Sequence, residues 1–359
     1  MLSNLEHAVA SSSPINWLPL ELLQNIFLYY LCGDNDLPET LLFVCRHWCD
    51  VAISFPILWS NIDPTSLRIN PKWTVRFIRA RCLRSYPLPL NLDLGVGVAL
   101  DAVVNTPTLL DRCTIIHIRT PEQWRTVESR LPRLTRLVIS CRVPVGKWKE
   151  VPTLQSLNLE GYYGLGDICP VVLLKNIIQL EATYSPALWP DIQKAASLAP
   201  KLQVLRLGII KIPPFKPIPH AIREPTLDQV THLVLRYANI SPEHTIRHPP
   251  SFEGVPCLTH LEILLYHLRN INGLLTFDHP TVARLTVIMF ANPTPAEMKT
   301  TEDPADIQGL LDLMKGLPNL KNADLTVTPV IMASLRAELG RNPSIYPPLS
   351  IIRHYLPTP

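Results

Sequence analysis

The strongest constraint on the fold is a repeated pattern, P-x-L-x-x-L-x-L, in which an apolar residue fills each position written L. The residue five places after the proline is called the central position. Six copies begin at Pro132, Pro152, Pro200, Pro256, Pro280 and Pro318, with central positions Leu137, Leu157, Leu205, Leu261, Leu285 and Ala323. Three further copies lack the proline and are centred on Ile116, Leu180 and Leu233. Internal repeats of this kind predict a fold assembled from similar units that stack on one another.

Successive central positions are 20 to 28 residues apart, except for a step of 38 residues before Ala323. Leucine-rich repeats have a period of about 20 to 29 residues. The L-x-L residues would share one face of a short strand, and each unit could bury its apolar edge only against its neighbours. The pattern therefore predicts an α/β solenoid of alternating strands and helices over about residues 87–340, with an inserted helix in the longest step.

Other local signals place helices and strands between the repeats. Three segments begin with a helix-capping residue followed by proline, namely Thr120–Pro121, Asp303–Pro304 and Thr328–Pro329. Gly340 is expected just after the end of the last of these helices. One more half-buried strand is predicted by the strict alternation of Leu88, Leu90, Leu92 and Leu94. The proline-rich segments 211–226 and 241–254 are expected to be loops.

Composition argues against several classes of protein. The sequence has 37 proline and only 13 glycine residues, so its turns must be built largely on proline. With 47% hydrophobic and 18% charged residues, the chain has enough apolar side chains for a large core. A net charge of +3 gives no strong attraction for nucleic acid, and no apolar run reaches the roughly 18 residues of a membrane span. Neither nucleic acid nor a membrane is therefore expected as a partner.

The cysteines and the N-terminal residues bear on the compartment. The eight cysteines are scattered and form no C-x-x-C pair, which is typical of proteins kept in a reducing environment. Residues 1–16 lack both the basic start and the continuous apolar run of a secretory signal. The expected location is therefore the cytoplasm, the nucleus or both.

Residues 17–62 carry a second pattern, with apolar residues at three- and four-residue steps. With Pro19 in its first turn, an amphipathic helix is predicted by Leu18, Leu22, Leu23, Ile26, Phe27 and Tyr30. After turn residues at 33–36, a single second helix that ends before Pro56 is predicted by Leu41, Leu42, Val44, Cys45, Trp48, Val51 and Ala52. A helix pair of this size cannot bury so much apolar surface alone, which implies a partner, either the rest of the chain or another protein.

These residues resemble the F-box motif, with L-P-x-E-L-L and I-F on the first helix and V-C-R-x-W, A and P-x-L-W on and after the second. The resemblance covers about 45 of the 359 residues, in order and with ordinary F-box spacing. The matching positions are Leu18, Pro19, Glu21, Leu22, Ile26, Phe27, Val44, Cys45, Arg46, Trp48, Ala52, Pro56, Leu58 and Trp59.

The resemblance implies that the chain docks onto the Skp adaptor, and through it onto the cullin, of a ubiquitin ligase, while a second domain captures a protein cargo. Some of the expected docking residues must instead pack between the helices, and the full set is Leu18, Pro19, Leu22, Ile26, Phe27, Val44, Cys45, Trp48, Leu58 and Trp59. The repeats resemble the irregular leucine-rich repeats common behind fungal F-boxes, although the asparagine of that family is absent after L-x-L, as at Tyr162 and Ala238. The alternative is a leucine-rich-repeat scaffold that binds the Skp adaptor without directing ubiquitination.

The expected organisation is a disordered lead at 1–13, an F-box at 14–62, a bridging helix at 63–86, a repeat domain at 87–340 and a C-terminal tail at 341–359. The bridging helix has Asn70 as N-cap, Pro71 in its first turn, and an apolar stripe formed by Trp73, Phe77, Ile78 and Cys82. Its other side is expected to be solvated or, as an alternative, to bind RNA or cargo through Lys72, Arg76, Arg79, Arg81 and Arg84.

Candidate catalytic and metal-binding residues do not assemble into a site in the sequence. His244 and His248 are four residues apart, but the two prolines that follow argue against the helix that would bring them to one metal. Cys257, His260 and His267 fit surface or core positions of a repeat. The sequence contains neither a Gly-rich phosphate loop nor a nucleophile elbow. We expect no catalytic residue, metal or cofactor, and an enzyme with a metal site on the proline-rich loops is a third alternative.

Overall fold

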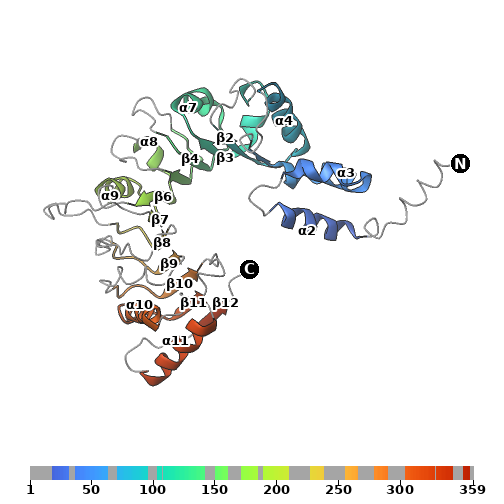
Figure 1. Cartoon of the computed structure of the whole chain (residues 1–359). Coiled ribbons are helices and arrows are strands. Elements are labelled where there is room, and N and C mark those ends of the chain that lie inside the picture. The colour runs from blue at the N-terminus through green and yellow to red at the C-terminus, as the bar shows by residue number, and fades with distance from the viewer. Residues whose placement is uncertain are drawn as a thin grey trace. The chain divides into compact units, whose positions relative to one another are not determined.

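The computed structural model (Figure 1) describes residues 18–31, 37–63, 71–95, 103–106, 108–141, 150–160, 171–184, 189–209, 227–237, 255–265, 279–289, 304–327, 329–342 and 351–355. The chain divides into two compact units, Met1–Val138 and Ile139–Pro359. Over the described residues, the order of the strands in the sheet follows their order in the chain from β1 to β12, and α-helices alternate with many of them. The α/β class predicted from the repeats is therefore confirmed.

The first unit begins with helices and continues into parallel strands. Strand β1 pairs with β2, and β2 pairs with β3. Strand β4, Arg136–Ile139, spans the boundary between the units. The other elements are α2 (Leu20–Tyr30), η2 (Pro38–Phe43), α3 (Arg46–Ile53), η3 (Pro56–Trp59), β1 (Asn61–Ile62), α4 (Pro71–Arg84), β2 (Leu90–Leu94), α6 (Leu109–Arg112), β3 (Cys113–Ile118), α7 (Pro121–Val127) and η4 (Glu128–Arg130).

The second unit is a row of parallel strands, with helices α8 to α11 on one side of them (Figure 1). Its strands are β5 (Ser156–Leu159), β6 (Gln179–Tyr184), β7 (Val204–Ile209), β8 (His232–Tyr237), β9 (His260–Leu265), β10 (Arg284–Met289), β11 (Asn322–Thr326) and β12 (Ile351–Tyr355). Its helices are α8 (Val171–Leu174), α9 (Trp189–Ser197), α10 (Pro304–Lys315) and α11 (Pro329–Arg341). Helix α10 occupies the long step before Ala323, as predicted.

The pairing of the strands confirms the predicted register of the repeats. Leu205 lies opposite Leu180 on one side and Leu233 on the other. Leu261 lies opposite Leu233 and Leu285 in the same way, and Leu285 lies opposite Ala323. Because all of these central side chains are buried, each repeat closes the apolar interior of the next.

The prolines of the repeats stand in turns that precede the strands. The backbone N–H of Leu202 donates to the carbonyl of Ala199 at 3.0 Å, and that of Leu258 donates to the carbonyl of Val255 at 3.2 Å. Pro200 and Pro256 are thus the second residues of four-residue turns, a position that suits the fixed φ of proline. The leucine that closes each turn is buried, which explains why proline precedes an apolar residue by two places.

Helix α7 shows how the caps tie helices to the sheet. Thr120 Oγ1 accepts from the N–H of Gln123 at 3.4 Å, and Gln123 Oε1 accepts from the N–H of Thr120 at 3.0 Å, which forms a capping box. The Gln123 amide also donates to the carbonyls of Leu94 and Gly95 at 2.7 and 3.0 Å, at the end of β2. The predicted caps Asp303 and Thr328 lie outside the described residues.

Several local predictions were wrong. The single helix predicted from Leu41 to Ala52 is two helices, η2 and α3. The strand predicted from Leu88 begins at Leu90. Strand β12 pairs with β11 in a region where no strand was expected, because the proline-rich composition there indicated only a tail. Residues 33–36, 211–226 and 241–254, predicted as turns or loops, lie outside the described residues.

Gly340 was also placed wrongly, since α11 continues through it to Arg341. A Cβ at this position would meet no atom within 4 Å, and the backbone there does not have a positive φ. Alanine is a better helix former than glycine because it leaves the unfolded chain less freedom.

We therefore expect Gly340→Ala to raise the free energy of unfolding by about 0.5 kcal/mol. Urea denaturation of the full chain measures the change. Ala337→Gly, at an exposed position one turn earlier, is the matched opposite change and should lower stability by up to about 1 kcal/mol. A loss of stability in Gly340→Ala would mean that the residue ends the helix after all.

Among the described residues, no helix has the length and apolar character needed to cross a membrane.

Candidate docking surface

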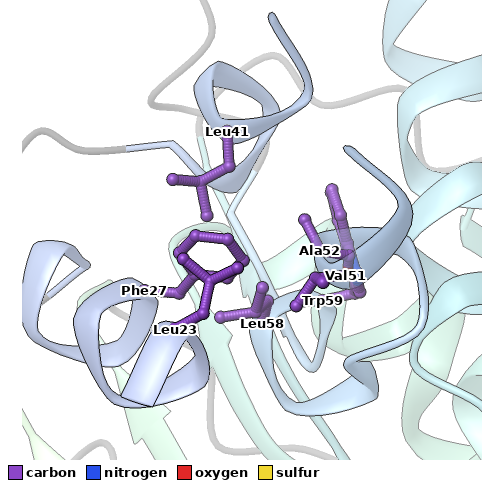
Figure 2. Packing of buried hydrophobic residues seen from close by; sticks show 7 residues of the cluster. All are labelled: Leu23, Phe27, Leu41, Val51, Ala52, Leu58 and Trp59. Atoms are coloured by element: carbon purple, nitrogen blue, oxygen red, sulfur yellow. Dashed lines mark hydrogen bonds between the residues drawn. The ribbon is translucent and has the colours of Figure 1, made fainter. Parts of the chain in front are cut away.

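The helices at the start of the first unit enclose a small core of their own (Figure 2). Phe27 and Trp48 contact each other with ring centroids 5.0 Å apart, and Trp59 Nε1 donates to the carbonyl of Ala52 at 2.7 Å. The indole of Trp59 therefore fixes η3 against α3. The buried members of this core are Leu23, Phe27, Leu41, Val51, Ala52, Leu58 and Trp59.

A break between η2 and α3 turns two apolar side chains outward. Cys45 has an extended backbone, with φ −162° and ψ 170°, and its Sγ accepts from the N–H of Trp48 at 3.5 Å. Cys45 thus caps α3, so the helix cannot continue from η2. On the η2 side of the break, Phe43 is 85% exposed and Val44 is 54% exposed.

Helix α2 is apolar on two faces. Leu23 and Phe27 point into the core, whereas Leu22 and Ile26 are 51% and 42% exposed. Tyr29 continues this outer row, because positions i, i+4 and i+7 lie on one side of a helix. The core is already closed on the inner face, so the outer row is left for another contact.

The structure divides the ten predicted docking residues into three groups. Phe27, Leu58 and Trp59 are buried and pack the core. Leu18, Cys45 and Trp48 are half-buried, and Leu18 and Trp48 pack against the same core. The residues left accessible to a partner are Pro19, Leu22, Ile26 and Val44. We use the name docking surface for the exposed apolar side chains Leu22, Ile26, Tyr29, Phe43 and Val44.

Sequence reasoning missed two members of the docking surface. Tyr29 could have been found, because it continues the row of Leu22 and Ile26 by three residues. Phe43 could also have been found, because in the predicted helix it lies on the side opposite the apolar stripe of Leu41, Cys45 and Trp48.

The bridging helix α4 is fastened to these helices by arginine. Arg81 donates from Nε and Nη2 to the two carboxylate oxygens of Glu39 at 2.9 and 2.6 Å, and from Nη1 to the carbonyl of Asn61 at 2.6 Å. The guanidinium of Arg84 lies 4.5 Å from the ring centroid of Trp59. The prediction that Arg81 is solvated was wrong, because its side chain is buried in this ion pair.

Two cysteines of the first unit, Cys82 and Cys113, are buried. Burial raises the pKa of the Cys113 thiol to about 12 and also raises that of Cys82, so both thiols stay protonated at neutral pH. His244, His248 and His267 lie outside the described residues.

One group of three side chains suited to a metal, His232, His260 and Glu262, lies in the second unit, and it contains His260 but not Cys257 of the candidates considered from sequence. In the described part of the chain, no other group of this kind was found. Cys257 itself is exposed.

No protein-family model matches the chain, and no curated protein gives a significant match.

Proposed function

We propose that the chain is the substrate-recognition adaptor of a Skp–cullin–F-box ubiquitin ligase. In this proposal, the helices of residues 18–62 act as an F-box that docks onto the Skp adaptor. The parallel repeats act as a leucine-rich-repeat domain that binds the protein to be ubiquitinated. The proposal places the protein in the cytoplasm, the nucleus or both, where the other subunits of such a ligase act.

The observation that carries the proposal is the concentration of exposed apolar side chains on the N-terminal helices. Fourteen large apolar side chains are exposed in the described residues, and ten of them lie between Leu20 and Ile57. Clusters of exposed apolar residues often mark surfaces that bind another protein. Because these helices also carry the F-box-like residues, the docking surface and the motif support the same function.

The core of these helices is complete without the exposed apolar side chains. Leu23, Phe27 and Trp59 are fully buried within the helices, so the exposed side chains are not needed to complete this core. Full burial of an exposed Leu or Ile side chain contributes about 1.5–3 kcal/mol, and about half of the surface of Leu22 and Ile26 is still available for burial. A protein partner that covers the docking surface would therefore gain a substantial part of its binding energy there.

The mechanism is proximity rather than chemistry by this chain. An adaptor that holds a ligase with one unit and a cargo with another raises the effective concentration of the cargo at the ligase. The transferring chemistry then belongs to other subunits. The ion pair of Arg81 with Glu39 suits this role, because it fixes α4 to the docking helices and so limits motion within the first unit.

Co-purification tests the proposal. We expect the full chain, tagged and expressed in a eukaryotic cell, to bring down the Skp adaptor and a cullin in stoichiometric amounts. The chain produced alone should associate with itself, because its docking surface is uncovered. Capture of the Skp adaptor without cullin would favour the scaffold that does not direct ubiquitination. A soluble monomer that brings down neither protein would contradict both functions.

A further inference from the structure

We propose that His232, His260 and Glu262 form a zinc-binding site on the second unit. Each residue offers one ligand atom, and these atoms lie within 4.8 Å of one another. The site lies on the sheet that the repeats form. It does not depend on the docking function proposed for the N-terminal helices.

Strand register brings the three residues together. His232 in β8 lies directly opposite His260 in the neighbouring parallel strand β9. Glu262 follows His260 by two residues and therefore lies on the same face of the sheet. Leu233 follows His232, and Leu261 lies between His260 and Glu262. Both leucines are buried and point to the opposite face of the sheet. The three polar side chains thus share the face opposite the apolar interior.

The distances suit zinc. His232 Nε2 lies 3.3 Å from a carboxylate oxygen of Glu262. Ligand atoms held at 2.0–2.2 Å from a tetrahedral zinc ion are about 3.3–3.6 Å apart. The rings of His232 and His260 are stacked with centroids 4.1 Å apart, and the ligand atoms of all three residues lie within 4.8 Å of one another.

The two histidines have ring nitrogens available for a metal. His232 Nε2 is buried and lies 3.3 Å from the Glu262 carboxylate. A zinc ion between these two atoms would bind both of them. His260 Nε2 lies 3.0 Å from the Thr286 hydroxyl. If His260 donates its proton to that oxygen, Nδ1 keeps the lone pair that a metal needs.

The chemistry of the three side chains suits zinc. Two imidazoles and one carboxylate are a common ligand set for this ion.

Neighbouring charges set the expected strength of the site. Arg206 lies close enough to Glu262 to lower its pKa, so its positive charge opposes a bound cation. Arg284 is already held by Asp324, with Nη2 2.7 Å from the carboxylate. The side chains of His232 and Glu262 are 24% and 23% exposed, which lets an ion enter from solvent. Three protein ligands leave a fourth position for water.

Titration of the metal-free full chain with zinc chloride, in competition with a chromophoric chelator, tests the proposal. We expect the wild-type chain to bind one zinc ion. Glu262→Gln and His232→Ala should each weaken the affinity for zinc at least tenfold. Thr286→Val removes only the hydroxyl group that contacts the ring of His260. Loss of a hydrogen bond to a metal ligand typically weakens metal binding about 10- to 100-fold. Arg206→Gln should instead strengthen zinc binding, because it removes an opposing charge.

His117→Gln is the matched control. His117 Nδ1 lies 3.0 Å from the carboxylate of Asp93 in the first unit, so this variant also removes an imidazole beside a carboxylate. It should leave zinc binding unchanged. Circular dichroism of each variant shows whether the fold is kept, and the isosteric Glu262→Gln and Thr286→Val retain the test if His232→Ala fails to fold. Absence of zinc binding in the wild type, or the same zinc affinity in Glu262→Gln and Thr286→Val as in the wild type, would overturn the proposal.

Discussion

Leu205→Asp is expected to unfold the second unit. Leu205 is fully buried and lies between the equally buried Leu180 and Leu233 on the neighbouring strands. A carboxylate there would have no cation or donor within the apolar interior. Burying such a group costs several kcal/mol, against a typical stability of about 5–15 kcal/mol for a whole domain.

The effect should exceed that of a simple truncation, because stacked repeats depend on their neighbours. Loss of the contact at β7 removes support from β6 and β8 together. Circular dichroism at increasing temperature should show the strand signal of the second unit lost at or below room temperature in this variant.

Gln203→Asp is the matched control. It places the same new carboxylate two residues earlier, on a side chain that is exposed. We expect it to change the unfolding temperature only slightly, since surface substitutions are usually within about 0.5 kcal/mol. If Leu205→Asp melts at the wild-type temperature, then the central positions do not form the core.

The repeats could be predicted from sequence because one local rule fixes most of their structure. Residues two apart on a strand share a face, so L-x-L segments such as Leu205–Leu207 define the buried side of each strand. Proline two places before the first leucine marks the turn that begins each unit. Both signals lie within about eight residues, so no knowledge of distant contacts is required.

The errors arise where a contact between distant residues decides the local structure. Arg81 looks like a solvated helix residue until Glu39, 42 residues earlier, is placed beside it. The break before α3 depends on the Sγ of Cys45, which caps the helix in place of the usual oxygen. Apolar spacing alone cannot reveal either contact, because it records which residues are apolar and not which polar atoms meet.

The sequence contains a signal that places two of the proposed zinc ligands side by side. His232 and His260 are 28 residues apart, yet each comes immediately before a central position, Leu233 or Leu261. Residues at the same place in adjacent repeats become neighbours across the sheet. A comparison of polar residues at equal repeat positions would therefore have brought the two histidines together, whereas motif searches over short spacings could not.

The docking surface leads to the second large effect. We expect Leu22→Glu combined with Ile26→Glu to weaken binding of the Skp adaptor by about 2–4 kcal/mol, the scale of interface hot spots. This corresponds to roughly 30- to 1,000-fold in affinity, at about 1.4 kcal/mol for each factor of ten. Both side chains are exposed on the outer row of α2, and glutamate preserves helix propensity. The fold of the helices should therefore survive. Changes at Leu18 would be less informative, because that side chain also packs against the core.

Two further variants separate docking from folding. Phe27→Ala removes a fully buried ring and should cost about 3–5 kcal/mol of stability, whereas the outer double variant should leave the unfolding temperature near that of the wild type. Leu83→Glu is the matched surface control, because Leu83 is exposed on α4, outside the docking surface. Adaptor affinity of each purified variant is measured by titration calorimetry, and thermal unfolding by circular dichroism. Wild-type affinity in the outer double variant, or an equal loss in Leu83→Glu, would show that α2 does not contact the adaptor. The expected result, lost binding with an intact fold, would leave a chain that still holds its cargo but no longer delivers it to the ligase, so the lifetime of the bound cargo in cells should increase.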